Sequence, residues 1–138
     1  MSYLNRIQAK DPSANPFFTL MGIEVVSVEK EKVVLKMRVR PDMLNGVGWL
    51  QGGMLVAIAD EAMALAIYPQ LGENEGIATV SESTSFIKGV RDGVIFAEAR
   101  VIKKGRRVAF TESEVFTGTN ERTILSRTSA AFAVTNNK

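Results

Sequence analysis

Residues 54 to 68 read MLVAIADEAMALAIY and form the one long helix candidate of the chain. The run is rich in Ala, Leu and Met, which favour helix, and Pro69 and Gly72 follow it as stop signals. It is apolar on nearly every face, which is typical of a helix surrounded by protein. We therefore expect a buried central helix that carries two acids, Asp60 and Glu61.

The segments on either side of this helix are expected to be strands. In VVLKMRVR, at residues 33–40, apolar and basic residues alternate as in a half-buried antiparallel strand, and residues 23–28 precede it as another strand. After the helix, glycine-containing turns separate four strand-like runs, at residues 77–88, 94–104, 107–117 and 123–134. The first twenty residues predict one or two short helical turns. This order predicts an α+β fold in one domain over residues 1–138, with a curved antiparallel sheet of five to six strands wrapped around one long helix.

The composition excludes several classes of function. The chain has no histidine and no cysteine, which removes Ser-His pairs, thiol nucleophiles, disulfides and zinc sites built on imidazole or thiolate. Acid–base chemistry must come from Asp, Glu, Lys, Tyr, backbone amides or water. A formal net charge of +2 is too small to argue for nucleic acid. The N-terminus lacks a signal-peptide core and the apolar run 54–67 is too short to span a bilayer, so we expect a cytoplasmic protein without a membrane partner.

Two glycines stand where a loop leads into the long helix. The amides of Gly52 and Gly53 belong to the unpaired first turn, where the helix dipole favours an anion or a developing oxyanion. The alternative is a tight loop that needs small residues next to a crowded helix.

Asp60 is a carboxylate within an apolar run and must therefore reach a cavity, a partner or solvent. The alternative is a helix residue that surfaces at a sheet edge. Glu61 lies about 100° further around the helix, so we do not expect both acids in one small pocket. We expect Glu61 to meet a basic residue or solvent.

The chain resembles the hotdog-fold acyl-CoA thioesterases, and within the 4-hydroxybenzoyl-CoA thioesterase superfamily the PaaI-like (phenylacetate degradation) subgroup. The resemblance covers nearly the whole chain and lies in the order and spacing of four stretches: NPFFTLMGIEV, NGVGWLQGGMLVAIAD, TVSESTSFIKGV and RVIKKGRRVAFTESEVF. In this family the motif usually reads His-Gly-Gly, whereas here it reads Gln51-Gly52-Gly53. The resemblance implies hydrolysis of an acyl- or aryl-CoA thioester to the free acid and coenzyme A, with no other cofactor and no metal.

The resemblance also implies roles for individual residues. Asp60 matches the catalytic acid, which acts as general base or nucleophile, and the Gly52 amide matches the group that polarises the thioester carbonyl. Asn45 matches a loop residue that positions water or substrate; the alternative is that it is only a turn residue. Thr79 matches a strand hydroxyl near the attacking water; the alternative is that it is only a β-favouring strand residue. The hairpin that lies near the CoA phosphates in the family matches Lys103, Lys104, Gly105, Arg106 and Arg107, which otherwise form a solvated turn. Trp49 and Phe18 are candidates for the acyl pocket or for core packing.

Gln51 is the departure from the family pattern. Gln and neutral His both donate a hydrogen bond, but Gln cannot take up a proton. If the family histidine acts through its backbone and one hydrogen bond, Gln51 can replace it. If the histidine must shuttle a proton, Gln51 cannot. Because Asp60, Gly52 and Asn45 are retained, we expect an active enzyme.

The spacing of the motif predicts the assembly. Gly52 and Asp60 are eight residues apart, which is about 12 Å of helix rise, too far for both to serve one carbonyl. Two antiparallel helices related by a twofold axis bring each helix end to the middle of its partner, so we expect a homodimer with shared sites. The family resemblance extends this expectation to a homotetramer formed from two dimers.

Two other functions compete with this interpretation. One is a non-catalytic hotdog protein that binds acyl-CoA. The other is a hotdog hydratase or dehydratase, which generally uses a His–acid pair and is disfavoured by a chain without histidine.

Overall fold

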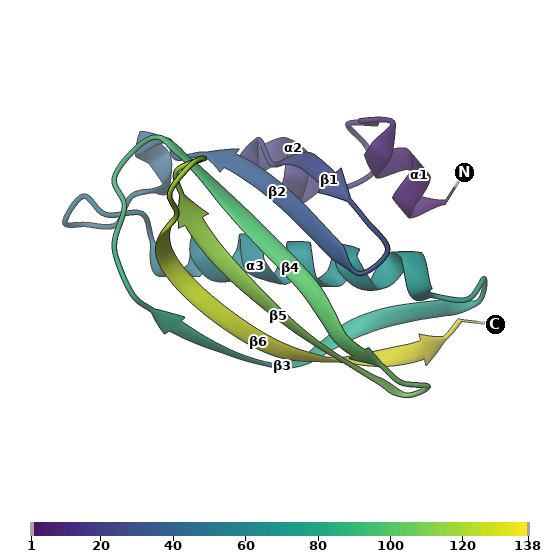
Figure 1. The fold of residues 1–138 in the computed structure, drawn as a ribbon. Coiled ribbons are helices and arrows are strands. Elements are labelled where there is room, and N and C mark those ends of the chain that lie inside the picture. The colour runs from purple at the N-terminus through teal and green to yellow at the C-terminus, as the bar shows by residue number, and fades with distance from the viewer. Residues whose placement is uncertain (1, 138) are drawn as a thin grey trace.

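The computed structural model describes residues 2–137, and the elements follow the chain in the predicted order (Figure 1). The helical elements are α1 (Tyr3–Gln8), α2 (Pro16–Met21), the 3-10 turn η1 (Pro41–Met43), the long helix α3 (Gly52–Ile67) and the 3-10 turn η2 (Tyr68–Gln70). The strands are β1 (Glu24–Val28), β2 (Lys32–Arg38), β3 (Glu75–Phe86), β4 (Val94–Lys104), β5 (Val108–Thr117) and β6 (Thr123–Asn136).

The strands form one antiparallel sheet in the order β1-β2-β4-β5-β6-β3. The strand that follows α3 therefore crosses to the far edge of the sheet, beside β6, while the last three strands form a meander. Figure 1 shows the sheet curving around α3, with α1 and α2 beyond β1. The predicted hotdog fold, with a curved sheet around one central helix, is confirmed.

The core lies between α3 and the concave face of the sheet. As predicted for VVLKMRVR, Val33, Leu35 and Met37 are almost fully buried. The long helix contributes the largest share from one element, with eight buried residues: Leu55, Ile58, Ala59, Ala62, Met63, Leu65, Ala66 and Ile67. Burial of this apolar surface is what holds the helix in the sheet, because the helix carries few polar side chains with which to face water.

The helical stretch is longer than the apolar run suggested. With η2 it extends over Gly52–Gln70, 19 residues that by length and composition are enough to cross a membrane. The core helix of a globular protein passes the same test, and here the sheet wraps around this one (Figure 1). The helix is accordingly weak evidence for a membrane segment.

One side of the molecule is left open. On α3 the stripe formed by Ala57, Asp60 and Ala64 is only half-buried. The neighbouring edge of the sheet is β3 and the residue after it, where Val80 and Ile87 expose 65% and 54% of their surfaces. An edge strand of 12 residues leaves a row of backbone groups unpaired, and here exposed apolar side chains accompany that open edge. The candidate site lies on this side.

Candidate functional site

Asp60 stands midway along α3 and reaches a cavity of about 330 Å³. Its Oδ1 accepts a hydrogen bond from Thr79 Oγ1 at 2.9 Å, so a helix carboxylate and a strand hydroxyl that are far apart in sequence meet in the cavity wall. The other lining residues come from α3, β3, β6 and the N-terminal segment: Tyr3, Ala14, Asn15, Pro16, Glu61, Ala64, Tyr68, Ile77, Ala78 and Phe132. The structure thus brings together Asp60 and Thr79, two of the residues selected from the sequence.

Glu61 corrects an expectation. It lines the same cavity as Asp60, where it is half-buried, and its partner is not a basic residue: its Oε2 accepts a hydrogen bond from Asn15 Nδ2 at 3.3 Å. The prediction treated the pocket as small, whereas the N-terminal segment forms an extra wall, and two residues 100° apart on the helix line different sides. Burial, followed by the nearby Asp60, raises the pKa of Glu61.

The N-terminus of α3 presents one free amide. Gln51 is the N-cap residue, and its Oε1 accepts a short hydrogen bond from the amide of Gly53. Among residues 2–137 no acceptor contacts the amide of Gly52, the first residue of the helix. A side chain at Gly52 would meet the ring of Phe86, 3.2 Å from the position of a Cβ. The geometry therefore distinguishes the two glycines: Gly53 is capped and Gly52 is available to a ligand.

Asn45 organises the loop before the helix. Its Oδ1 accepts hydrogen bonds from the amides of Val47 and Trp49, at 3.0 and 3.1 Å. Trp49 stacks on Arg91, whose guanidinium carbon lies 3.9 Å from the ring centroid, and packs closely over Gly89. Neither Asn45 nor Trp49 reaches the cavity of Asp60 in this protomer, and the other acyl-pocket candidate, Phe18, is buried in the core.

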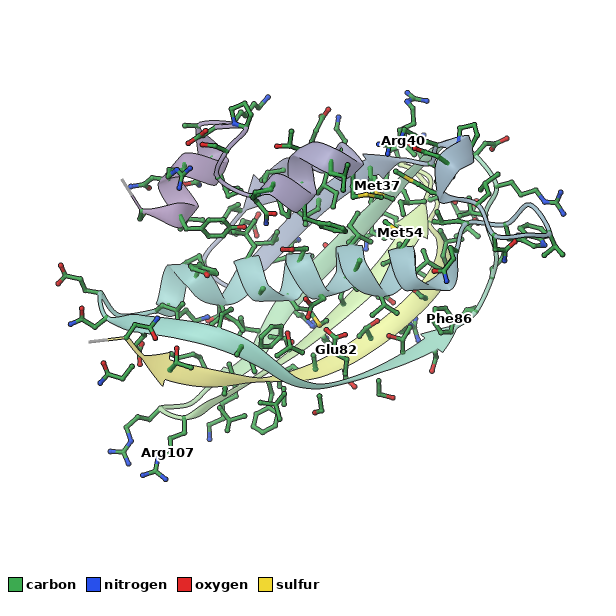
Figure 2. The ribbon with its side chains drawn as sticks, turned by 180° about the vertical axis from the view of Figure 1, so that it is seen from behind. Met37, Arg40, Met54, Glu82, Phe86 and Arg107 are labelled. Atoms are coloured by element: carbon green, nitrogen blue, oxygen red, sulfur yellow. The ribbon has the colours of Figure 1, made fainter. Side chains whose placement is uncertain are left out.

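The basic hairpin is the turn between β4 and β5, closed by a hydrogen bond from the amide of Gly105 to the carbonyl of Val108. Lys104 is occupied by Glu75, with its Nζ 3.0 Å from Oε1. Lys103, Arg106 and Arg107 are exposed. Figure 2 shows Arg107 at the opposite end of the molecule from Met54 and Phe86. In one protomer the hairpin and the N-terminus of α3 are therefore far apart.

The structure adds residues that the sequence did not single out. Tyr3 and Tyr68 pack in a tilted arrangement with ring centroids 4.9 Å apart, and Tyr3 Oη accepts a hydrogen bond from Asn15 Nδ2 at 2.8 Å. Burial raises the pKa of both tyrosines. Glu82 on β3 is a further addition, because burial, followed by the nearby Asp60, raises the pKa of its carboxyl to about 8. No motif marks these residues, since they converge only through the fold.

A larger hollow of about 710 Å³ lies elsewhere, on the outer face of the sheet. Its cations are already paired: Arg100 contacts Glu112, Arg127 contacts Glu114 at 2.8 Å, and Lys32 contacts Glu98 at 3.3 Å. An anionic ligand would have to break these pairs. The cavity at Asp60, which holds two half-buried acids next to a strand hydroxyl, is the stronger candidate site.

Comparison with known proteins supports the same family. The family model described as "Thioesterase superfamily" matches residues 48–124, more than half of the chain. A 1,4-dihydroxy-2-naphthoyl-CoA hydrolase from Listeria monocytogenes is 26% identical over 111 residues, 80% of this chain and 90% of that protein. The acyl-coenzyme A thioesterase PaaI of Escherichia coli is 29% identical over 98 residues, 69% of this chain and 66% of that protein.

A solved structure agrees at the level of the fold. The crystal structure of a thioesterase family protein from Silicibacter pomeroyi superposes with a TM-score of 0.87 at 17% identity, covering 98% of this chain and 99% of the other. The matched region of the family model includes the Gln51-Gly52-Gly53 motif, the whole of α3 and the strand that carries Thr79. The chain belongs to the thioesterase superfamily and is a thioester hydrolase with the hotdog fold.

Proposed function

We propose that the protein hydrolyses an acyl- or aryl-CoA thioester, with Asp60 as the general base or nucleophile and the Gly52 amide as the oxyanion donor. The observation that carries the proposal is the Asp60 carboxylate in a cavity wall, held at 2.9 Å by Thr79. The named hydrolases among the relatives act on CoA thioesters, which supports the same substrate class.

In the general-base route, Asp60 takes a proton from water while the water oxygen attacks the thioester carbonyl carbon. The negative charge that develops on the carbonyl oxygen is stabilised by the Gly52 amide and the positive end of the helix dipole. The carbon–sulfur bond then breaks, and the departing sulfur of coenzyme A takes the proton from Asp60. In the nucleophilic route, the carboxylate attacks the same carbon, the carbon–sulfur bond breaks and coenzyme A leaves as its thiolate. Water then hydrolyses the resulting mixed anhydride, which releases the acid, restores the Asp60 carboxylate and supplies the proton that the thiolate takes up.

The two groups serve one carbonyl only if they come from different subunits. Gly52 lies at the end of α3 and Asp60 eight residues further, about 12 Å along the helix. The open stripe of α3 and the unpaired edge of β3, with Val80 and Ile87 exposed on or next to it, are the surfaces that a second copy of this chain would cover. We therefore infer a homodimer with two shared sites, in which the partner's helix end faces Asp60, and the pairing of two dimers stays a prediction.

The same arrangement gives the basic hairpin its role. In one protomer it lies at the far end from Gly52, whereas a twofold axis brings each hairpin toward the partner's helix end. Lys103, Arg106 and Arg107 are then the donors proposed for the CoA phosphates, because Lys104 is paired with Glu75. Asn45 keeps its proposed role of positioning water or substrate through its amide nitrogen, since its oxygen is used by the loop.

Gln51 fits the proposal as a cap. Its side-chain oxygen holds the Gly53 amide, which leaves Gly52 as the free donor at the helix end. This role needs a hydrogen-bond acceptor but no proton transfer, so Gln51 satisfies it as a neutral imidazole would. The substitution is therefore compatible with an active thioesterase.

The polar residues of the cavity wall also indicate which acyl groups the site would prefer. The hydroxyl of Tyr3 and the amide of Asn15 form a hydrogen-bonded polar group beside Glu61, on the side of the cavity away from the sheet. An acyl group that occupies this space would gain from a hydroxyl or another hydrogen-bonding substituent, because the Tyr3 hydroxyl accepts from Asn15 but its own proton has no acceptor among residues 2–137. We propose hydroxylated aryl or acyl-CoA thioesters as preferred substrates.

The test is a thiol-release assay on the pure protein with acyl-CoAs of matched size with and without a hydroxyl. We expect turnover, and Asp60→Asn is expected to lower kcat by at least about 100-fold because it removes the base. The matched control is Asp42→Asn, which removes an exposed carboxylate paired with Arg40 outside the cavity, and it should leave kcat unchanged. Turnover that survives in Asp60→Asn would refute the role of Asp60. Tight CoA binding without any turnover would instead favour the non-catalytic acyl-CoA binding protein.

A further inference from the structure

Strand β3 contains a bulge next to the candidate base. In its pairing with β6, Thr79 lies opposite Phe132 and Ser81 lies opposite Ala131, so Val80 is the extra residue. In a regular strand, residues 79 and 82 would point to opposite faces of the sheet. One inserted residue reverses the alternation beyond it, and Glu82 therefore joins Thr79 on the same face.

The partners on β6 identify that face. Thr79 lies opposite Phe132 and Glu82 opposite Ala130, and both β6 residues are buried in the core, at 1% and 7% exposure. Residues directly opposite in an antiparallel pair project to the same side, so Thr79 and Glu82 both face α3. Figure 2 shows Glu82 between the sheet and the middle of the helix.

The environment of the Glu82 carboxyl favours its protonated form. Its Oε1 is buried and has no hydrogen-bond partner among residues 2–137, and the carboxyl lies against that of Asp60. Two ionised carboxylates have only acceptors to offer each other, whereas a protonated one can donate. Burial, followed by the contact with Asp60, raises the pKa of Glu82 to about 8.

The surroundings of Glu82 offer no counter-charge. The titratable group of α3 that faces Glu82 is Asp60. The next residue of the helix, Glu61, is also an acid and provides no positive charge. The β6 residues on this face are Thr128, Ala130 and Phe132, of which Thr128 is bound to Thr84 of β3. Among residues 2–137 no Lys or Arg forms an ion pair with Asp60 or Glu82. The negative charge of the Glu82 carboxyl is therefore neutralised by protonation and not by a nearby cation.

We propose that Glu82 is a positioning residue for Asp60: its protonated carboxyl donates a hydrogen bond to the Asp60 carboxylate. The proposal rests on the proposed function of Asp60 and deepens it. Thr79 and Glu82 then hold the base from one strand, and the bulge at Val80 is what allows both to do so. The remaining lone pairs of Asp60 stay available to water or substrate.

This arrangement makes the enzyme sensitive to alkaline pH. Below about pH 8 Glu82 carries its proton and the hydrogen bond is present, and as pH rises through the raised pKa the proton is lost and two like charges face each other. The ionisation belongs to the pair of carboxyls together. We expect kcat to fall on the alkaline side with an apparent pKa near 8.

The test compares kcat against pH for the wild type and two variants. Glu82→Gln keeps a donor of the same shape but has no proton to lose, so we expect kcat at pH 7 within about threefold of the wild type and no alkaline decline near pH 8. Glu82→Leu removes the donor and is expected to lower kcat by about 10- to 100-fold with little change in KM. Glu112→Gln, a carboxylate paired with Arg100 outside this cavity, is the matched control and should keep the wild-type profile.

An activity-independent readout protects the test against variants that fold poorly. At pH 7 the infrared difference spectrum between wild type and Glu82→Gln should contain the carbonyl band of a protonated carboxylic acid, which disappears above pH 8. The proposal is overturned if Glu82→Gln retains the alkaline decline, if it loses as much kcat as Glu82→Leu, or if no protonated-acid band is present. Failure of Asp60→Asn to lower kcat would remove the proposed base itself, a separate result.

Discussion

Gln51 shows how one side chain can replace another when the task is geometric. Its side-chain oxygen accepts the hydrogen bond of the Gly53 amide, and the neighbouring Gly52 amide stays available to a ligand. Asp60, Thr79 and Glu82 form a second group of residues, in which Thr79 holds the helix carboxylate and Glu82 is proposed to hold it as well. The two groups differ in what they require: the first needs a hydrogen-bond acceptor at one position, and the second, as proposed, needs a proton on Glu82.

Removal of the Gln51 cap should weaken the helix end. Gln51→Ala is expected to lower the free energy of unfolding by about 1 kcal/mol, because one amide of the first turn loses its acceptor. Urea denaturation of the two proteins measures the difference. Equal stability would show that the cap contributes nothing.

Gln51→His provides the complementary variant. A neutral imidazole can accept from the Gly53 amide and an imidazolium cannot, so the variant should match the wild type at pH 8 and lose activity below about pH 6.5. The wild-type rate should show no such step from this position. A step of equal size in both proteins would contradict the capping role.

At the scale of elements, α3 and β3 set the site. The helix was recognisable because a 15-residue apolar run without strand alternation has few alternatives, and the strands because apolar and polar residues alternate between glycine-containing turns. The bulge at Val80 was not predictable, since nothing in TVSESTSF distinguishes a regular strand from a bulged one. Simple alternation would place Glu82 on the face away from Thr79, which is why the sequence did not point to it. Glu61 was misjudged for a related reason, because its partner Asn15 is 46 positions away in the chain.

The first residue of α3 allows a direct test of the backbone amide. Proline is favoured at this position, and the backbone of Gln51 before it, with φ −61° and ψ 130°, is compatible with a following proline. Gly52→Pro removes the N–H, and we expect kcat to fall by about 10²- to 10³-fold while the helix is retained, as circular dichroism will show. Gly52→Ala is the matched control, since it adds a comparable Cβ against Phe86 and keeps the N–H. Equal losses in both variants would assign the effect to crowding at Phe86.

At the scale of the whole molecule, the open side of the protomer and the separation of Gly52 from Asp60 have one explanation. The open edge of β3, the half-buried stripe of α3 and the basic hairpin at the far end are the three surfaces that the proposed dimer accounts for. In that proposal a twofold partner would cover the first two and bring the third to a helix end. The sequence predicts this assembly from the spacing of Gly52 and Asp60 together with the roles that the family resemblance implies for them, because the rise of an α-helix fixes the distance between two residues on it.

The central claim is that each site combines Gly52 of one subunit with Asp60 of the other, and mixed dimers test it most directly. Gly52→Pro and Asp60→Asn subunits are each expected to be nearly inactive alone, and a mixture unfolded and refolded at equal amounts should contain about half heterodimers. Every heterodimer has one site with both groups intact, so we predict recovery of about a quarter of the wild-type kcat per subunit. A mixture that stays as inactive as its two components, with heterodimers demonstrated by mass, would contradict the shared site.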